Sequence, residues 1–434
     1  MKPLEHFSQS FSRREFLKTT SAAASLSLIG GLSVERSAFA AGNDTIKIAL
    51  IGCGGRGSGA ADQALNTGNV KLVAMADTFE NKLKSSLENL TTAHAKKVEV
   101  PPEHQFVGLD AYKKAMALAD VVLLASPPGF RAPHFEEAVR QGKNIFMEKP
   151  LGTDAPSIRR ILAANEDAKK KNLKVCVGFQ RHHESGYNDI IKRIHDGAIG
   201  DVHTLRVYWR GGSRAGLPRE KGETELQYQI RNWYYFTWLS GDHIVEQHCH
   251  NIDAGNWIKQ AYPVRAQGVG GRQVRNGLEN GQIYDHFSVE FEYEDGTRMF
   301  SMCSQIPHLF GDVSEHAIGS KGSADMGRQF AIKGPTPFRT KNNANGWQQE
   351  HHDFFGAMRK GDPFNEVEYG AKSTMTAILG RMATYSGEKI EWDDAFNSKL
   401  ELAPAIDSWD AKTPVMPDAD GRYPVAMPGL TKAL

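Results

Sequence analysis

Apolar and polar positions in the first half of the chain alternate between short apolar runs and helical patterns. The runs 46–51, 70–77, 120–126, 144–150 and 173–180 are rich in Val, Ile, Leu and Ala, as buried parallel strands are. Amphipathic segments separate them, for example "PHFEEAVRQGK", which is expected to end at Gly142. Strand and helix repeating with short loops predict an α/β fold with a doubly wound parallel sheet.

The pattern changes after Gly200 to longer extended segments. Four or more of them, including a hairpin around Glu294–Thr297, predict an α+β region with a large open, mostly antiparallel sheet. A late helix carries Met375, Ile378, Leu379 and Met382 as an apolar stripe. We therefore expect a first domain over 44–175, a substrate and oligomerisation domain over 176–370, and a C-terminal helix and tail over 371–434 that pack back on the first domain.

The first forty residues form a separate unit. Arg13-Arg14, with Phe16-Leu17-Lys18 behind, precede a mild apolar run that ends in Ala38-Phe39-Ala40. A charged start, a short apolar stretch and an A-x-A end are typical of an export signal, and the arginine pair resembles a twin-arginine signal more than a Sec signal. We expect residues 1–40 to direct the folded protein, with its cofactor already bound, through the twin-arginine machinery to the periplasm or beyond.

Composition narrows the classes of partner. The 434 residues are 40% apolar and 24% charged, with a net charge of +1, which is ordinary for a globular protein and gives no reason to expect nucleic acid or membrane insertion. The four cysteines, Cys53, Cys176, Cys249 and Cys303, form no C-x-x-C motif. We expect free, buried thiols.

A glycine motif follows the first apolar run. Gly52-x-Gly54-x-x-Gly57 lies between that strand and a helical pattern, which is the setting of a Rossmann dinucleotide site. Gly52 would form the tight turn, Gly54 would admit the pyrophosphate and Gly57 would allow the helix to pack on the strand. The pyrophosphate would then lie at a helix N-terminus.

Asp77 ends the second predicted strand, at close to the roughly 20-residue spacing expected of the acid that binds the ribose. Its charge would repel a 2′-phosphate and no arginine follows it directly, so NAD is favoured over NADP. The alternative is a turn residue or helix cap.

"SGDHIVEQHCHNID", residues 240–253, concentrates titratable side chains. On one continuous helix to about Ile258, His243, Glu246, His250 and Asp253 would share a face, with His248 pointing elsewhere. The alternatives are a solvated face or a zinc site from His243, Glu246 and His250. No second ligand cluster of the H-E-x-x-H kind supports zinc, so we predict no metal.

"MEKPLGTDAPSIRRI" resembles the Gfo/Idh/MocA family (glucose-fructose oxidoreductase and inositol dehydrogenase), whose signature is E-K-P, here Glu148-Lys149-Pro150. The resemblance extends from about Ile46 to Trp392. It implies that Lys149 lies beside the nicotinamide and the substrate hydroxyl, and that "GFQRHH" supplies contacts from Gln180, Arg181 and His182. It also implies that one face of the second sheet walls the substrate site and the other makes a subunit interface.

The family's usual D-x-x-x-H-x-x-D pattern appears here as Glu246-x-x-x-His250-x-x-Asp253. The resemblance makes His250 the group that acts on the substrate hydroxyl, and its pKa suits proton removal near neutrality. Lys149 would stabilise the developing alkoxide. Glu246 is one methylene longer than the usual Asp, which leaves its role, substrate binding or tuning of His250, open.

The predicted site residues fall into three groups. The catalytic group is Lys149, His250 and Glu246. The cofactor group is Gly52, Gly54, Gly55, Arg56, Gly57, Asp77, Ser126, Pro127, Glu148, Lys149 and Gln180. The substrate group is Arg181, His182, Arg231, Trp233, Tyr234, His243 and Asp253, in part because the long segment between Arg210 and Asp242 is rich in Arg and aromatic side chains that suit a sugar ring; an interface loop or core aromatics are the alternative.

These features predict an exported oxidoreductase that transfers a hydride between a sugar, glycoside or cyclitol hydroxyl and a tightly bound NAD, as a dimer or tetramer. A nondissociable nucleotide would need a second substrate or an external acceptor to reset it. The first alternative is a glycosidase that uses bound NAD in a redox-neutral cycle. The second is a sugar-binding protein without catalysis, against which the joint presence of Lys149, Glu246 and His250 argues.

Overall fold

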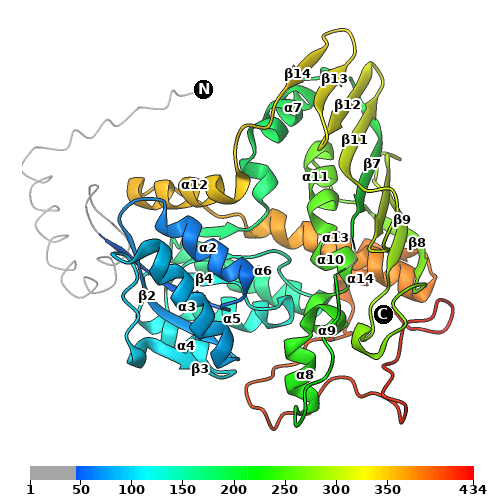
Figure 1. Cartoon of the computed structure of the whole chain (residues 1–434). Coiled ribbons are helices and arrows are strands. Elements are labelled where there is room, and N and C mark those ends of the chain that lie inside the picture. Colours follow the sequence, from blue (N-terminus) through cyan, green and yellow to red (C-terminus); the bar gives the residue numbers. More distant parts are fainter. Residues whose placement is uncertain (1–44, 213) are drawn as a thin grey trace, which may run out of the picture.

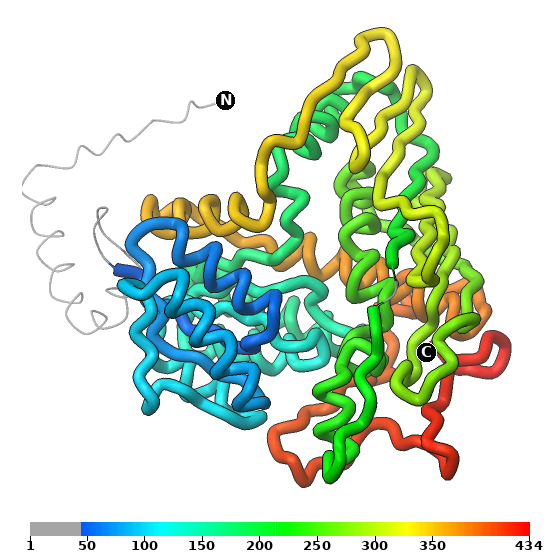
Figure 2. The backbone as a smooth tube through the Cα atoms, viewed as in Figure 1, coloured from blue at the N-terminus to red at the C-terminus, as the bar shows by residue number. Residues whose placement is uncertain are grey.

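The computed structural model describes residues 45–212 and 214–434, so the predicted export signal lies outside the described residues. Two sheets organise the chain, and they lie at opposite ends of the molecule with helices between them (Figure 1). The tube in Figure 2 shows the last segment of the chain, in red, running along the lower edge of the second part and ending beside the second sheet. No helix in these two stretches is long and apolar enough to span a membrane.

The first sheet has six strands in the order β3-β2-β1-β4-β5-β6, all parallel, as the alternating pattern predicts. Its strands are β1 (Ile46–Ile51), β2 (Val70–Asp77), β3 (Gln105–Val107), β4 (Val121–Leu124), β5 (Asn144–Met147) and β6 (Val175–Val177). Ile48 and Leu50 contribute to one apolar cluster and Ala49 and Ile51 to another, so both faces are covered and the doubly wound arrangement is confirmed. The sheet ends at Val177, two residues past the expected domain boundary, because β6 continues the apolar run.

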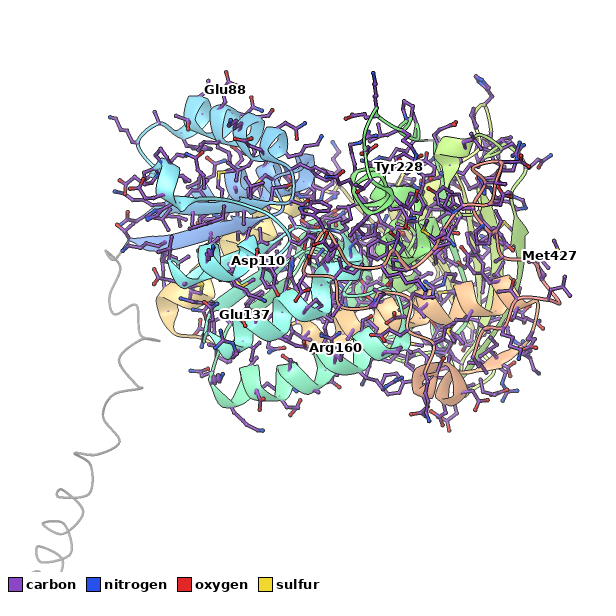
Figure 3. The ribbon with its side chains drawn as sticks, turned by 90° about the horizontal axis from the view of Figure 1, so that it is seen from below. Glu88, Asp110, Glu137, Arg160, Tyr228 and Met427 are labelled. Atoms are coloured by element: carbon purple, nitrogen blue, oxygen red, sulfur yellow. The ribbon has the colours of Figure 1, made fainter. Side chains whose placement is uncertain are left out.

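Six helices flank this sheet or lead away from it: α2 (Gly55–Leu65), α3 (Glu80–His94), α4 (Ala111–Ala117), α5 (Arg131–Arg140), α6 (Ala155–Lys170) and α7 (Ser185–His195). Seen from below in Figure 3, Glu88 of α3 and Glu137 of α5 lie on the outer helices of this domain. Their apolar sides cover the sheet and their charged sides face water, as amphipathic helices do.

The second sheet has nine strands in the order β14-β13-β12-β11-β7-β10-β9-β8-β15. They are β7 (Val202–Arg210), β8 (Arg265–Gly271), β9 (His286–Glu292), β10 (Arg298–Ser304), β11 (Asp312–Gly319), β12 (Gly322–Met326), β13 (Phe330–Lys333), β14 (Phe338–Thr340) and β15 (Ile390–Glu391). Neighbours are antiparallel except β7 and β10, which confirms the open, mostly antiparallel sheet.

Two late helices join the domains differently from expectation. Helix α12 (Gly346–Lys360), in the predicted second domain, packs on α2 and places Phe354, Phe355 and Met358 in the core of the first. Helix α13 (Val367–Ser386) contacts α6 of the first domain and β8 of the second, so it lies between them rather than on the first alone. It is buried on nearly all sides, which explains why its predicted stripe has no polar counterpart.

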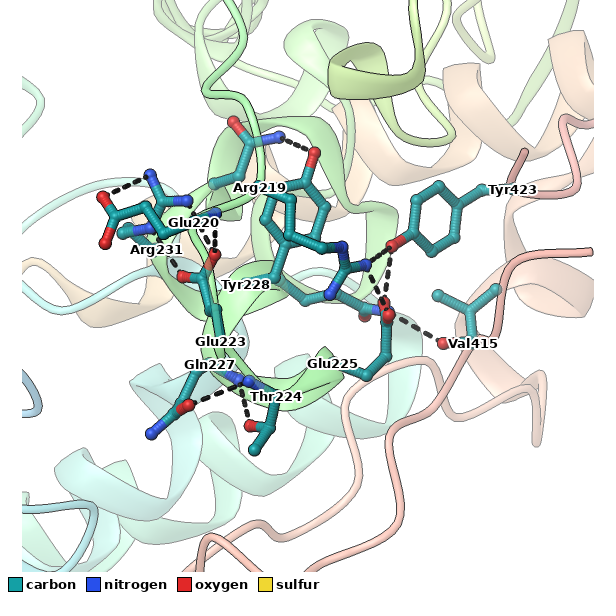
Figure 4. A network of polar contacts seen from close by, with 12 residues as sticks. Arg219, Glu220, Glu223, Thr224, Glu225, Gln227, Tyr228, Arg231, Val415 and Tyr423 are labelled. Carbon is teal, nitrogen blue, oxygen red and sulfur yellow. Dashed lines mark hydrogen bonds and ion pairs between the residues drawn. The ribbon is translucent and has the colours of Figure 1, made fainter. Parts of the chain in front are cut away.

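The chain after α14 (Trp392–Asn397) is an extended tail without helices or strands among its described residues. It crosses the short helix α8 (Glu225–Arg231), where Tyr423 donates to Glu225 at 2.5 Å and accepts from Arg219 at 3.1 Å (Figure 4). It also reaches the first domain: the main-chain amides of Leu402 and Ala403 donate to the Asp154 carboxylate. The tail therefore contacts both the first domain, at Asp154, and the segment around α8.

All four cysteines are free and buried, as predicted. Burial raises the pKa of Cys176 and Cys303 well above the ordinary thiol value, which keeps both thiols protonated and unreactive.

Candidate active site

A cavity of about 510 Å³ opens at the carboxyl ends of β1, β2, β4 and β5 and is closed on its other side by residues 214–250. All eleven residues of the predicted cofactor group line it, and so do Glu246, His250, Arg231 and Trp233. Carboxyl ends of parallel strands are where α/β sheets bind ligands. The structure therefore brings residues from distant parts of the sequence to one chamber.

The glycine turn has the shape that a dinucleotide requires. A side chain on Gly57 would lie 1.9 Å from the Gly52 oxygen, so only glycine lets α2 approach β1 this closely. Gly52 has φ +92°, which favours glycine, whereas a side chain on Gly54 would meet nothing within 4 Å. No side chain caps α2, whose first amides face the open space beside Gly54. These residues fit a pyrophosphate.

Asp77 both lines the cavity and holds the surrounding loops. Its carboxylate accepts from the amides of Cys53 at 2.6 Å and Phe79 at 2.8 Å. Burial raises its pKa, while those two amide bonds oppose the rise. The turn role is therefore present in the structure, and the ribose role stays a prediction that the position of Asp77 in the cavity wall fits. Lys82 of α3 also lines the wall beside it, a positive charge that the sequence analysis did not consider.

Arg56 and Glu148 form the wall next to the E-K-P turn. The Arg56 guanidinium lies 3.0 Å from the Glu148 carboxylate and 5.9 Å from the ring centre of Trp347. Trp347 comes from the first turn of α12 and also lines the cavity. This contact explains how α12 contributes to a site formed mainly by the first domain.

The predicted single helix over 240–258 is wrong. The chain forms α9 (Thr237–Ser240), α10 (His243–Glu246) and α11 (Cys249–Lys259), with left-handed Gly241 and a positive φ of 72° at Asp242 between the first two. The Asp242 carboxylate accepts from the amide of Tyr284 at 2.8 Å and from the Tyr385 hydroxyl, which pins this turn. Sequence periodicity contains no sign of these long-range acceptor contacts.

The second break, after Glu246, places Lys149. The Glu246 carbonyl is released from the helix and accepts the Lys149 ammonium, while the Glu246 carboxylate lies 3.4 Å from the same nitrogen. Burial disfavours the charged form of Lys149, but Glu246, with help from Glu148, outweighs burial and raises its pKa. The other Glu246 oxygen has no hydrogen-bond partner among the described residues, so it is available to a ligand hydroxyl.

His250 follows this break on α11. It lies edge-on to Phe179, with ring centres 5.7 Å apart, and its Nδ1 has no hydrogen-bond partner in the described chain. Burial, then the charges of Lys149 and Arg181, lower its pKa well below the ordinary value. The imidazole is therefore neutral at neutral pH, with its lone pair unprotonated, but it is a weaker base than the near-neutral pKa expected from the sequence implies.

Five predicted substrate residues lie outside the cavity, which corrects that group. His243 is fully buried against Phe287, because the break after Asp242 turns it toward the second sheet. His182 bonds Asp253 at 2.8 Å and is stacked between two aromatic rings.

The other two of the five are also held elsewhere. Arg181 pairs with Glu315 in the interior, and the Tyr234 hydroxyl accepts from Gln305 at 2.6 Å. Arg231 does line the cavity, but its guanidinium is bound to Glu223 at 2.6 Å, so it serves first to fold the segment around α8 (Figure 4).

The alternative of a zinc site does not fit the structure, because His243 packs against Phe287 and does not converge with Glu246 and His250. One other group, Cys176, His183 and Glu366, brings three potential ligand atoms within 4.8 Å of one another. His183 there already lies between Asp353 at 2.7 Å and Glu366 at 3.3 Å, so its nitrogens are engaged by carboxylates.

The cavity also contains residues that sequence reasoning missed. They are Phe79, Lys82, Leu109, Tyr112, Phe130, Arg131, His134, Arg214, Leu217, Gln247 and Trp347, among others. Leu217 belongs to the long segment whose composition had drawn attention, so a signal existed for it. Trp347 had none, because nothing local indicates that α12 packs on α2.

Comparisons with known proteins agree with this geometry. Residues 46–179 match the model of the oxidoreductase family with an NAD-binding Rossmann fold, and residues 187–325 match the GFO/IDH/MocA C-terminal domain. The inositol 2-dehydrogenase of Rhizobium meliloti is 24% identical over 75% of this chain and 87% of its own length.

Solved structures share the fold. The scyllo-inositol dehydrogenase of Lactobacillus casei, solved with NAD(H) and scyllo-inositol, superposes with a TM-score of 0.63 at 21% identity, over 81% of this chain and all of that one. The aldose-aldose oxidoreductase of Caulobacter crescentus gives a TM-score of 0.64 at 17% identity, over 80% and 100%. The two family matches, in order along one chain with the glycine turn and E-K-P in their places, show that the protein belongs to the Gfo/Idh/MocA family of NAD-binding oxidoreductases.

Proposed function

We propose that the protein is exported by the twin-arginine route, keeps NAD bound, and oxidises a secondary hydroxyl of a cyclitol or sugar. The observation that carries the proposal is one chamber in which Lys149, Glu246 and His250 face the glycine turn. The curated relatives named inositol 2-dehydrogenase support a polyol as substrate. The arginine pair near the N-terminus supports export.

The residues of the chamber divide the reaction between them. NAD bound at the glycine turn would supply the hydride acceptor. Lys149, kept charged by Glu246, would hold the hydroxyl oxygen and stabilise negative charge on it. His250, neutral because of its burial, would take the hydroxyl proton. The unpartnered Glu246 oxygen would accept a neighbouring hydroxyl and so orient a polyol.

The proposal includes a homo-oligomer formed through the open face of the second sheet. Val269 of β8 is 72% exposed, and Phe300 and Met302 of β10 are 40% and 43% exposed. Apolar side chains gathered on one sheet face are typical of an interface. Light scattering of the protein and of Phe300→Glu tests this, since a charge there should lower the molecular mass to that of one chain; an unchanged mass would place the interface elsewhere.

The activity is tested on protein purified without added nucleotide. Inositols, free hexoses and glycosides are added in turn, and the reduced-nicotinamide absorbance band is recorded. A band that appears with one polyol class, and is absent in Lys149→Met carrying the same amount of NAD, is the expected result. Cleavage of a glycoside with no net reduction would replace the proposal by a redox-neutral glycosidase, and protein purified without nucleotide would refute retention of the cofactor.

A further inference from the structure

A second, smaller cavity lies away from the candidate active site. It measures about 260 Å³ and is lined by the loop after β8 and by the tail, through Arg272, Arg275, Asn276, Gly277, Leu278, Gly281, Arg422, Tyr423 and Val425. It shares no lining residue with the larger cavity. Three arginines and no acidic residue line it, and one of them, Arg275, is buried, where a guanidinium group is normally paired with an acid.

The three guanidiniums bind neutral oxygens instead of carboxylates. Arg272 donates to the Gly281 carbonyl at 2.8 Å, Arg275 to the Tyr284 carbonyl at 2.7 Å, and Arg422 to the Asn276 carbonyl at 3.5 Å. Arg275 is only 2% exposed. The Nε groups of Arg272 and Arg275 are buried and have no hydrogen-bond partner within the described ranges. Two of the three arginines that line the pocket therefore have a donor group without a partner among the described residues.

Nearby carboxylates are committed to other donors. Asp285 accepts from the amides of Gln273 and Val274, at 2.7 and 2.6 Å, which fixes the arginine loop. Asp242 is held by the Tyr284 amide. The Glu279 carboxylate lies against Gly277 at the edge of the pocket and accepts from Asn280 at 3.2 Å.

The arginines also affect one another. Burial lowers the pKa of Arg272 and the like charge of Arg275 adds to this, whereas Asp242 and Asp285 oppose it. Bringing two such cations together costs free energy that a bound anion would offset.

We propose that this pocket binds an oxyanion, namely the phosphate, sulfate or carboxylate group of a small molecule, between Arg272, Arg275 and Arg422. Arginine forks match the geometry of such groups through paired N–H bonds. Because Arg422 belongs to the tail and Arg272 to the β8–β9 loop, the anion ties the tail to the second sheet. The volume suits a small organic anion and excludes a dinucleotide lying entirely inside it.

Hydrogen bonds lead from the pocket as far as Tyr234, which lies outside the main cavity. Arg275 donates to Gln305, and Gln305 donates to the Tyr234 hydroxyl at 2.6 Å. Burial, and then the charge of Glu246, raise the pKa of Tyr234, so that ring lies near the Lys149–Glu246 pair.

The test is calorimetric titration of NAD-loaded protein with inorganic phosphate, so that the pyrophosphate site is already filled. Arg272→Gln and Arg422→Gln are the test variants, and Arg339→Gln, an exposed arginine of β14, is the matched control. We expect saturable binding that each test variant weakens by about tenfold or more and the control leaves unchanged. Arg422 is exposed, so its replacement should not disturb folding.

Further arms identify the source of the anion. Sulfate, a sugar monophosphate and a dicarboxylate are titrated in parallel, and the tightest binder gives the ligand class. Equal binding in the protein and both test variants, or an equal response to chloride at the same ionic strength, would overturn the proposal. Anion binding in a protein that oxidises no polyol would leave this site standing and refute the proposed activity alone.

Discussion

The two walls of the main cavity are formed in contrasting ways. The cofactor wall comes from short turns after β1, β2, β4 and β5, where neighbouring residues in the sequence are neighbours in space. The opposite wall comes from α8, the broken run α9–α10–α11 and the chain before α8, held by distant partners such as Asp242 to Tyr284. A local motif specifies the first wall, whereas long-range hydrogen bonds specify the second.

Replacing Lys149 should give the largest effect, because it is the point where the two walls meet. Lys149→Met removes both contacts to Glu246 and the charge beside the reacting oxygen, so turnover should fall by about 10³-fold or more. NAD content should stay the same, since the glycine turn is untouched. Single-turnover reduction of bound NAD measures the loss, and Lys171→Met, whose ammonium donates to the Val139 carbonyl far from the cavity lining, is the control. Residual turnover within tenfold of the parent would contradict the assignment.

Variants of His250 and His243 test the break in the second wall, because an unbroken helix would put both side chains on one face. His250→Asn should lower turnover by about 10²-fold to 10³-fold, since the proton acceptor is lost. His243→Asn should leave turnover per folded molecule close to that of the parent and instead lower the thermal midpoint, because His243 is buried outside the cavity. Equal losses of turnover in the two variants would mean that both histidines act in the site, as a continuous helix predicts, and would contradict the break.

The same contrast explains which elements and site residues could be predicted from the sequence. Both sheets and the eleven residues of the predicted cofactor group could be predicted, because apolar runs, the glycine spacing and E-K-P are local signals. Lys82 and Trp347 of the same wall could not, because no local motif marks them. His243 and Asp253 were misplaced, because helical periodicity assumes that the helix continues. The left-handed Gly241 and the acceptor contacts of Asp242 stop it, and they depend on Tyr284 and Tyr385, far away in the chain. Arg181 and His182, predicted from the resemblance, and Tyr234, predicted from composition, lie outside the cavity because they bind interior partners.

Acid should destabilise the second wall through His248. Burial lowers the pKa of His248 to about 3, against an ordinary 6.5, and its Nε2 lies 2.8 Å from the Ser301 hydroxyl. The unfolded chain therefore binds a proton below pH 6.5 that the folded chain refuses, so stability is complete above 6.5 and falls as the pH drops toward 3. At about 1.4 kcal/mol per pH unit, this one residue should cost about 2 kcal/mol between pH 6.5 and 5.

His248→Gln is the variant that isolates this contribution. Urea unfolding at several pH values should show a shallower acid slope than in the parent, while His203→Gln, an exposed histidine of β7, keeps the parental slope. An unchanged slope in His248→Gln would mean that His248 is protonated in the folded protein. The acid dependence that remains is expected from other buried histidines, such as His134, whose pKa burial also lowers to about 3.

Asp77 should give the smallest effect, and it tests the cofactor wall, where all the predicted cofactor residues line the cavity. Asp77→Asn keeps an oxygen that can accept the Cys53 or Phe79 amide but removes the negative charge next to the ribose position. With Lys82 left in the same wall, NADP should gain on NAD by about tenfold in relative affinity, close to 1.4 kcal/mol. Competition binding of the two nucleotides measures the ratio, and Glu88→Gln on the exposed side of α3 should leave it unchanged. An unchanged ratio of NADP to NAD affinity in Asp77→Asn would mean that Asp77 only holds the loops through the Cys53 and Phe79 amides. The choice of nucleotide would then depend on Lys82 and its neighbours.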